Sequence, residues 1–108
     1  MNLAERSRLN LWQSFGNNNF EAMLIRRLPR FDRRYKKLPA EIKDRAEERE
    51  AIFKLNPFDY RLQTHKLHGK QKDEWSYSVG YNYRITFVFL KSGDVLYTDV
   101  GTHDEIYT

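Results

Sequence analysis

The spacing of apolar residues changes near Asn56-Pro57 from a helical period to a strand period. Before that point, apolar residues recur every three or four positions over 31–38 and again over 39–56, with Leu38-Pro39 between the two stretches. This pattern predicts two consecutive helices, the second with an exposed face rich in Glu and Arg. After Pro57, apolar and polar residues alternate, as they do over 75–80, which is typical of half-buried strands.

One more apolar run precedes the helices and predicts a first strand over 23–30. The strands predicted after the helices cover 61–67, 75–80, 83–90 and 95–101, with a hairpin turn over 91–94. A strand, two helices and then a run of strands indicate a small α+β domain. We expect a curved antiparallel sheet, with the two helices forming a hairpin that packs on one face of the sheet.

The chain as a whole is small, basic and free of cysteine. Its 108 residues suffice for one domain, and the lack of cysteine excludes disulfides and thiolate metal sites. A net charge of +4 fits a polyanionic partner such as RNA or an acidic protein, and it also fits a need for solubility alone. No window approaches the roughly 18 to 20 apolar residues of a membrane span, and no secretory pattern opens the chain. We therefore expect a cytoplasmic protein that does not associate with membranes.

The first residues of the chain have a pattern of their own. Their apolar residues are scattered among polar ones: Leu3, Leu9, Leu11, Trp12 and Phe15. They end in Gly16-Asn17-Asn18-Asn19, a strong turn or linker signal. We therefore divide the chain into an N-terminal extension or linker, residues 1–21, and a domain, residues 22–108. Three interpretations of the extension are open: a short helix, a flexible extension, or residues translated from a start codon placed too early. We favour an appendage, because the pattern from Met23 is complete without it.

The last predicted hairpin brings an arginine and a histidine to one face of the sheet. If Leu90 pairs with Val95, then His103 lies diagonally from Arg84, about 7–8 Å away. The apolar residues of the hairpin then face the helices: Ile85, Phe87, Phe89, Leu96 and Val100. Two interpretations follow. In the first, the open face binds a phosphate; in the second, Arg84 forms an ion pair with Asp99 and His103 is an ordinary exposed residue.

Several segments, taken in order, resemble the RelE/ParE toxin superfamily. Residues 23–31 and 35–39 resemble its opening strand and helix, and Asn56-Pro57 with His65-Lys66-Leu67 is similar to its central loop and strand. Tyr83-Arg84-Ile85 resembles a strand segment of the family. The closing residues 101–107, Gly-Thr-His-Asp-Glu-Ile-Tyr, resemble the C-terminal signature of the YafQ-like ribonuclease branch.

The resemblance implies the toxin of a type II toxin–antitoxin system, which a cognate antitoxin neutralises. In the ribonuclease branch such a toxin is a metal-free endoribonuclease that cuts mRNA on the ribosome through attack by the 2′-hydroxyl, without a cofactor. The C-terminal histidine favours this branch. The alternatives are a non-enzymatic ParE-like toxin that inhibits DNA gyrase and an inactive homologue that only binds an antitoxin. Operator DNA is a further expected partner of the toxin–antitoxin complex.

The resemblance also assigns candidate roles to residues at matching positions. The candidate catalytic groups are His103 as general acid, His65 as base, Arg84 as the cation that stabilises the phosphorane, and Tyr107 as a stacking or hydrogen-bonding group. The candidates for RNA binding are Lys66, Lys70, Lys72 and Tyr83. Two structural alternatives remain: His65 caps the loop at Gly69, and the lysines belong to an ordinary solvated loop. We expect no metal site, because the three histidines have no spaced set of partner ligands.

Overall fold

The computed structural model describes residues 23–68 and 73–107 of the chain. In chain order its elements are β1 (Ile25–Arg27), α1 (Pro29–Lys36), α2 (Ala40–Leu55), the 3-10 helix η1 (Tyr60–Leu62), β2 (His65–Lys66), β3 (Trp75–Gly80), β4 (Tyr83–Phe89), β5 (Val95–Thr102) and α3 (His103–Tyr107). Within these ranges, no helix has the length and apolar character needed to cross a membrane. The predicted extension, residues 1–21, and two candidate RNA-binding residues, Lys70 and Lys72, lie outside the described residues.

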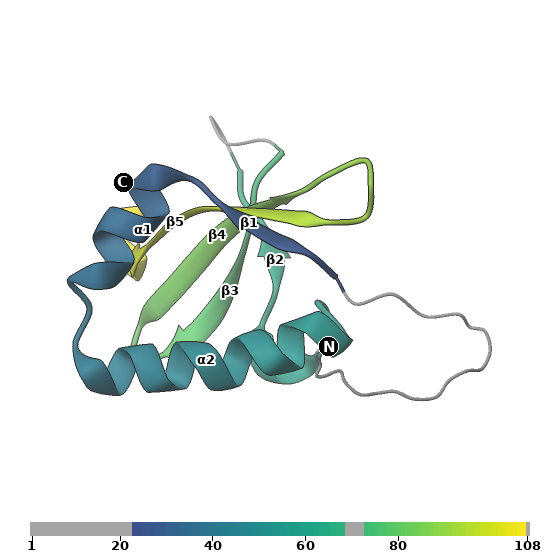
Figure 1. Ribbon diagram of the computed structural model, residues 1–108. Helices are drawn as coiled ribbons and strands as arrows, with labels where there is room; N and C mark the ends of the chain where they lie inside the picture. Colours follow the sequence, from purple (N-terminus) through teal and green to yellow (C-terminus); the bar gives the residue numbers. More distant parts are fainter. Residues whose placement is uncertain (1–22, 69–72, 108) are drawn as a thin grey trace.

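The five strands form one open, mixed sheet in the order β1-β5-β4-β3-β2 (Figure 1). The predicted α+β class is confirmed, and β2 to β5 pair in antiparallel fashion as expected. However, β1 pairs with β5 in parallel, with Ile25 opposite Val95, so the prediction of a curved and wholly antiparallel sheet needs correction to a mixed, uncurled one. The prediction failed here because no short turn joins β1 to β5, so no hairpin imposes an antiparallel direction on this pair.

Both predicted helices are present, and prolines mark where they begin. Pro29 is at the first turn of α1, where its missing N–H is not needed, and Pro39 directly precedes α2. Helix α1 lies against β5, whereas α2 lies against β3, and Figure 1 shows the two helices running in different directions. The predicted side-by-side hairpin is therefore replaced by two diverging helices: Phe31 of α1 packs against Tyr97 of β5, whereas Phe53 of α2 packs closest to Tyr77 of β3.

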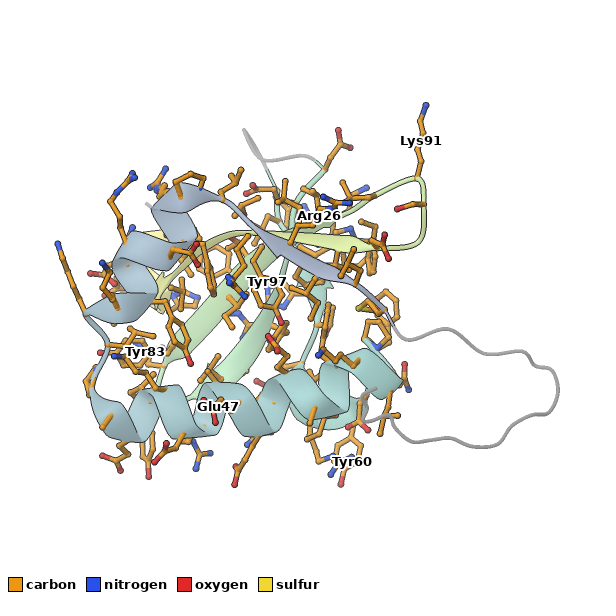
Figure 2. All side chains as sticks on the ribbon, viewed as in Figure 1. Arg26, Glu47, Tyr60, Tyr83, Lys91 and Tyr97 are labelled. Atoms are coloured by element: carbon orange, nitrogen blue, oxygen red, sulfur yellow. The ribbon has the colours of Figure 1, made fainter. Side chains whose placement is uncertain are left out.

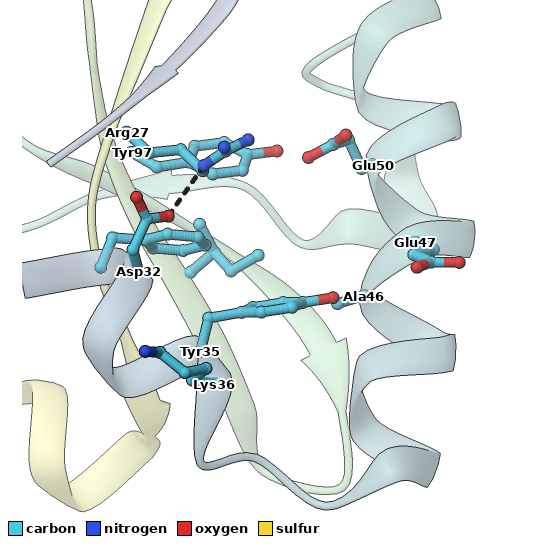
Figure 3. Close-up of a pocket in the computed structure, with 10 residues that line it drawn as sticks. Arg27, Asp32, Tyr35, Lys36, Ala46, Glu47, Glu50 and Tyr97 are labelled. Carbon is cyan, nitrogen blue, oxygen red and sulfur yellow. Dashed lines mark hydrogen bonds and ion pairs between the residues drawn. The ribbon is translucent and has the colours of Figure 1, made fainter. Parts of the chain in front are cut away.

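The divergence of α1 and α2 leaves a cleft of about 420 Å³ between them (Figure 3). The side chains of Phe31, Ile85 and Tyr97 contribute apolar surface to this cleft. Its rim is charged, with an Arg27–Asp32 ion pair at 2.8 Å on one side and acidic residues of α2 on the other. The cleft is thus a feature of the helix-covered face of the sheet.

Aromatic residues form the centre of the hydrophobic core between α2 and the sheet. The Phe53 ring is fully buried and lies 4.7 Å from the Tyr77 ring and 4.9 Å from the Phe87 ring, centroid to centroid. The hydroxyls of Tyr77 and Tyr97 hydrogen-bond each other at 2.7 Å, so these buried polar groups have partners. Burial raises the pKa of both phenols above the ordinary value of 10, because the buried site disfavours the phenolate.

The β4–β5 hairpin contains a bulge at Thr98, where β5 has one residue more than β4. Between the turn and the bulge, Val95 pairs with Phe89, so the assumed pairing with Leu90 was wrong by one residue. Beyond the bulge the assumed register is correct, because the extra residue restores it. Arg84 therefore faces the open side of the sheet, as predicted.

A charged turn fixes the segment between α2 and β2, and it yields a pH-dependent prediction. The Asp59 carboxylate accepts hydrogen bonds from the backbone N–H and the guanidinium of Arg61, with the shortest at 2.9 Å. These bonds lower the pKa of Asp59 to about 2 from its ordinary value of 3.8. A lowered pKa in the folded state adds stability above the ordinary value, and that stability is lost as pH falls towards 2. We expect Asp59→Asn to lower the melting temperature at pH 7 but not at pH 2.

Thermal melts followed by circular dichroism across this pH range would check the prediction. Asp44→Asn removes an exposed carboxylate from α2 and is the matched control, for which we expect no comparable pH-dependent difference. If Asp59→Asn lowered the melting temperature equally at both pH values, the effect would come from the shape of the side chain and not from its charge.

Candidate active site

A buried arginine lies at the centre of a polar cluster on the open face of the sheet, away from α2. Arg84 of β4 is only 8% exposed. Its Nε donates a hydrogen bond to Ser76 Oγ at 2.8 Å, and its Nη2 donates to the carbonyl oxygens of Gln63 at 2.8 Å and Ser76 at 3.3 Å. Strand pairing sets this arrangement, because β3 carries Ser76 between Arg84 on β4 and His65 on β2.

A chain of hydrogen bonds leads from Arg84 to His65. The Tyr107 hydroxyl lies 2.8 Å from Ser76 Oγ and 2.8 Å from His65 Nε2. His65 Nδ1 lies 3.1 Å from the Gln63 carbonyl oxygen, which can only accept, so we assign the ring proton to Nδ1. The 3.4 Å approach of Arg84 Nη2 to the same nitrogen is the weaker contact. With this tautomer Ser76 donates to Tyr107 and Tyr107 donates to His65, so the chain ends at a nitrogen that can accept a proton.

Arg84 has only neutral hydrogen-bond partners in this cluster. Within residues 23–68 and 73–107, no carboxylate forms an ion pair with it. Burial lowers the pKa of Arg84 and the nearby Tyr107 phenol acts in the opposite direction, but its ordinary value of 12.5 is high enough to keep the side chain charged at neutral pH. A buried cation without a carboxylate partner is stabilised by a bound anion. The cluster is therefore suited to an anionic group such as a phosphate.

Tyr107 lies between two histidine rings. The His65 ring is nearly parallel to it, with 6.1 Å between centroids and 9° between planes. The His103 ring is closer, at 4.3 Å, and its side chain is 54% exposed, with Nδ1 3.6 Å from Asp104 Oδ1. One phenol thus contacts both a histidine that accepts its proton and a histidine open to solvent.

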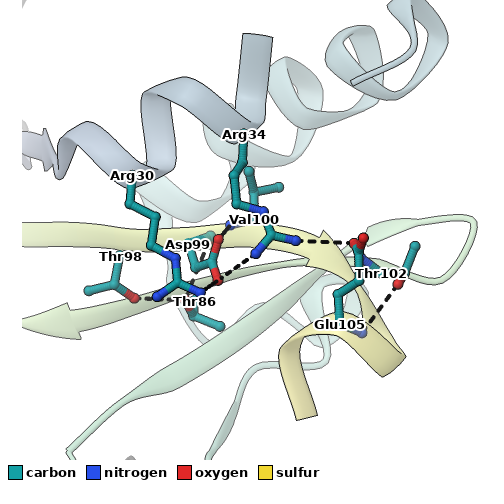
Figure 4. Close-up of polar contacts among 8 residues, drawn as sticks. All are labelled: Arg30, Arg34, Thr86, Thr98, Asp99, Val100, Thr102 and Glu105. Atoms are coloured by element: carbon teal, nitrogen blue, oxygen red, sulfur yellow. Dashed lines mark hydrogen bonds and ion pairs between the residues drawn. The ribbon is translucent and has the colours of Figure 1, made fainter. Parts of the chain in front are cut away.

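One salt bridge from α1 reaches the short helix α3, which carries Tyr107 and His103 (Figure 4). Thr102 and Glu105 cap its first turn reciprocally, through Glu105 Oε1 accepting from the Thr102 N–H at 2.8 Å and Thr102 Oγ1 accepting from the Glu105 N–H at 3.3 Å. Arg34 contacts both Glu105, at 3.3 Å, and Asp99, at 3.2 Å, and Arg30 adds a second contact to Asp99 at 3.2 Å. The first helix therefore contacts the C-terminal helix directly through Arg34, and it contacts the preceding strand through Asp99.

The structure brings together all four candidate catalytic residues, His65, Arg84, His103 and Tyr107. The alternative Arg84–Asp99 ion pair is wrong, because Asp99 pairs with Arg30 and Arg34 of α1. Among the candidate RNA-binding residues, Lys66 is exposed on β2, with its Nζ 6.0 Å above the Trp75 ring. Tyr83 is not at the cluster: it packs against the core on the helix-covered side of the sheet, since it neighbours Arg84 on the same strand and points the opposite way.

Sequence reasoning missed two members of the cluster, Ser76 and Gln63. The alternation of β3 put Ser76 on its polar face, and the pairing of β3 with β2 would have placed it beside His65, so a signal for it existed. Gln63 contributes its backbone carbonyl, from a left-handed conformation with φ of 49°. No side-chain pattern predicts such a contact. Within the described ranges, no group of three or more potential ligands is arranged to hold a metal ion.

Comparison with known proteins rests on structure, since no protein-family model and no curated protein sequence matches this chain. The toxin in the DinJ–YafQ toxin–antitoxin complex of E. coli superposes with a TM-score of 0.63 over 82% of this chain and 100% of its own length, at 14% identity. A YoeB/ParE toxin from Agrobacterium tumefaciens gives 0.64 over 75% and 99%, at 16% identity. The RelB–RelE antitoxin–toxin complex of Methanococcus jannaschii gives 0.59 over 76% and 94%, at 19% identity. This chain has the RelE/YafQ toxin fold.

In this RelE/YafQ fold, the polar cluster occupies the open sheet face together with the C-terminal helix. The sheet, α1 and α2 supply the scaffold, whereas β2 and α3 supply the exposed histidines. At 14–19% identity the likeness establishes the fold alone. What the cluster does must be argued from its own residues.

Proposed function

We propose that this protein is the toxin of a type II toxin–antitoxin system and that it cleaves mRNA on the ribosome as an endoribonuclease. The observation that carries the proposal is the buried Arg84 cation beside the Tyr107–His65 pair, because the cluster combines a positive charge with a proton acceptor. Cleavage of a phosphodiester by its own 2′-hydroxyl needs both. The shared RelE/YafQ toxin fold supports the same assignment.

In the proposed reaction, the RNA 2′-hydroxyl gives its proton to the Tyr107 oxygen while the Tyr107 proton moves to His65 Nε2. The 2′-oxygen attacks the adjacent phosphorus, the bond to the 5′-oxygen breaks, and a 2′,3′-cyclic phosphate remains. Protonated His103, which contacts Tyr107 and is exposed, donates a proton to the leaving 5′-oxygen. The positive charge of Arg84 stabilises the negative charge that develops on the phosphate oxygens. It acts electrostatically and through its hydrogen bond to Ser76.

A basic surface on α1 supports binding of an RNA backbone. Five cations line one shallow depression on this helix: Arg30, Arg33, Arg34, Lys36 and Lys37. Sequence reasoning had assigned RNA contacts to Lys66 and the lysines of the following loop, and it did not single out this helix. Because α1 also contacts α3 through Arg34, we propose that this basic surface flanks the path of the bound RNA, whereas Lys66 lies over Trp75 on the other face of the sheet.

The proposed partners are a cognate antitoxin and mRNA on the ribosome, in the cytoplasm, with operator DNA as a partner of the antitoxin complex. Two of the similar structures are toxin–antitoxin complexes, which supports an antitoxin partner. The net charge of +4 fits a partner with acidic segments.

Induced expression in a bacterium would test the function, with the wild type compared with Tyr107→Phe and His103→Ala. We expect the wild type to arrest growth and to produce codon-positioned cuts in a translated message, detected by primer extension. Each substitution removes one proton-transferring group and is expected to slow cleavage about a hundredfold or more. Growth would then recover, and the cuts would weaken in parallel.

Tyr60→Phe is the matched control for the loss of a phenolic hydroxyl, since Tyr60 is 85% exposed and lies in η1. It is expected to behave as wild type. Growth arrest without RNA cuts, equally strong in the His103→Ala variant, would reject the ribonuclease and favour a non-enzymatic toxin that acts on DNA gyrase.

A further inference from the structure

A second cavity, of about 490 Å³, lies on the open face of the sheet. Thr86 of β4 lines this cavity; it is the strand partner of Ser76 and lies two positions from Arg84. Two positions along a strand span about 7 Å, so the cavity begins beside the candidate active site. No residue that lines it transfers a proton in the proposed reaction. We call this cavity the open-face pocket, defined by Leu28, Leu67, Glu74, Thr86, Thr98 and Ile106.

Part of the wall of the open-face pocket is apolar and consists of Leu28, Leu67 and Ile106. Leu67 is 3% exposed and Ile106 is 7% exposed, so packing fixes both side chains. Leu67 follows His65 by two positions, and Ile106 directly precedes Tyr107, so the segments that carry catalytic groups also shape the pocket. Apolar walls with a few polar groups are typical of sites that bind a flat, mostly apolar group such as a nucleobase.

The polar floor of the pocket presents hydrogen-bond acceptors. Thr86 is 3% exposed, and its Oγ1 lies 2.7 Å from Thr98 Oγ1 (Figure 4). Thr86 Oγ1 also donates to the Asp99 carbonyl oxygen at 3.4 Å, and a hydroxyl has one proton, so we assign Thr98 as the donor of the shorter bond. The Thr98 oxygen then keeps lone pairs that can accept from a ligand. The floor therefore suits a ligand that carries N–H donors.

The Asp99 carboxylate at the edge of the pocket already has partners for both oxygens. Oδ2 lies 3.2 Å from guanidinium nitrogens of Arg30 and Arg34, and Oδ1 accepts from the Val100 N–H at 2.8 Å. The Arg30 side chain remains 63% exposed beside the pocket. A guanidinium plane can stack on a base, and its charge attracts the adjoining phosphates. Arg30 is therefore available to a bound nucleotide, whereas Asp99 is not.

Glu74 has both carboxylate oxygens available for a ligand. Within residues 23–68 and 73–107, no group forms a hydrogen bond or an ion pair with this carboxylate. Glu74 precedes Ser76 by two positions, so it points to the same face and lies diagonally from Thr86, at about 7–8 Å. The residue is half-buried. A half-buried carboxylate without a cationic partner is stabilised by a ligand that donates to both oxygens.

We propose that the open-face pocket binds a guanine base, with the Glu74 carboxylate accepting from guanine N1–H and N2–H. In the proposed ribonuclease, on which this assignment rests, the base belongs to one of the two nucleotides that flank the phosphate cut beside Arg84. Guanine alone among the four RNA bases places two N–H donors side by side on its Watson–Crick edge, which match the two oxygens of a carboxylate. Adenine and cytosine place an unprotonated ring nitrogen beside their amino group, and uracil has carbonyls on both sides of its N–H. Each of these bases turns a lone pair towards Glu74.

Single-turnover cleavage on programmed ribosomes, with the full-length protein, tests the assignment. The messages differ in one base, guanine or adenine, at each position that flanks the cut in turn. We expect the wild type to cut beside guanine about tenfold faster or more, the usual discrimination of a bidentate base contact. Glu74→Gln replaces one acceptor with a donor, which suits adenine, so the guanine-to-adenine ratio of rates should fall at least about tenfold. Glu48→Gln, exposed on α2, is the matched control and is expected to keep the wild-type ratio.

The same guanine-to-adenine ratio in the wild type and in Glu74→Gln would overturn the guanine pocket, while the cleavage itself would still support the proposed function. If the wild type cuts no message, the ribonuclease function fails, and a binding measurement decides the pocket. Guanosine 5′-monophosphate is expected to shift the amide NMR signals of Thr86 and Thr98 more than uridine 5′-monophosphate does, and to lose this advantage in Glu74→Gln. Equal shifts with the two nucleotides in the wild type would contradict the assignment.

Discussion

Replacing Arg84 with glutamine is expected to lower the rate of RNA cleavage about a hundred- to a thousandfold, the usual cost of removing a preorganised group that stabilises developing charge. Arg84 is the only charged member of the hydrogen-bond chain that ends at His65, and burial keeps water from screening it. The measurement is single-turnover cleavage of mRNA on programmed ribosomes with purified protein. Arg84→Lys keeps the charge but cannot reproduce the separate bonds from Nε and Nη2, so we expect it to remain strongly impaired.

An unfolded variant must be distinguished from one that is folded but catalytically impaired. Circular dichroism and a thermal melt would show whether Arg84→Gln is folded at the assay temperature. Arg26→Gln is the matched control, because it removes the same charge from an exposed position on the edge strand β1 (Figure 2). A folded Arg84→Gln variant that cleaves as fast as the Arg26→Gln control would show that the cluster does not perform the reaction.

The sequence was sufficient for the α+β class, because the change of period near Asn56-Pro57 separates helices from strands without any long-range information. The sequence also predicted correctly which face of the sheet carries Arg84, although the assumed pairing of β4 with β5 contained an error. The assumed hairpin register was one residue out near the turn, and the bulge at Thr98 compensated for it. On the turn side of the bulge the error persisted, so Tyr97 and not Leu96 faces the helices. Nothing local in the sequence distinguishes a bulged β5 from a regular one.

The candidate site was predictable in its side chains but not in its backbone contacts. His65, Arg84 and Tyr107 were identified through a family resemblance, whereas the contacts that join them depend on the pairing of β2 with β3. That pairing follows a loop of no distinctive pattern, so the role of Ser76 was not foreseen. The arrangement of the helices was missed for a similar reason. Periodicity gives the apolar side of each helix, but which strand each one covers depends on how the large core residues fit together.

Replacing Phe53 with alanine is expected to destabilise the domain by about 3–5 kcal/mol, the range measured when a buried phenylalanine is truncated. Phe53 is fully buried and lies against Tyr77, Phe87 and Tyr97, so its loss opens a cavity at the point where α2 meets three strands. Domains of this size have only about 5–15 kcal/mol of stability in total. A large part of the free energy of unfolding would therefore be lost. The hydrogen-bonded hydroxyls of Tyr77 and Tyr97 would also lose part of the apolar side chain that packs against them.

Urea unfolding followed by far-UV circular dichroism would measure the change in free energy of unfolding. Tyr60→Ala is the matched control, because it also removes an aromatic ring but from a position that is 85% exposed and points away from the sheet (Figure 2). It is expected to change stability by less than about 0.5 kcal/mol. A Phe53→Ala loss as small as that of Tyr60→Ala would mean that the core can close around the missing ring, and that α2 is held mainly by its polar contacts with β3 and η1.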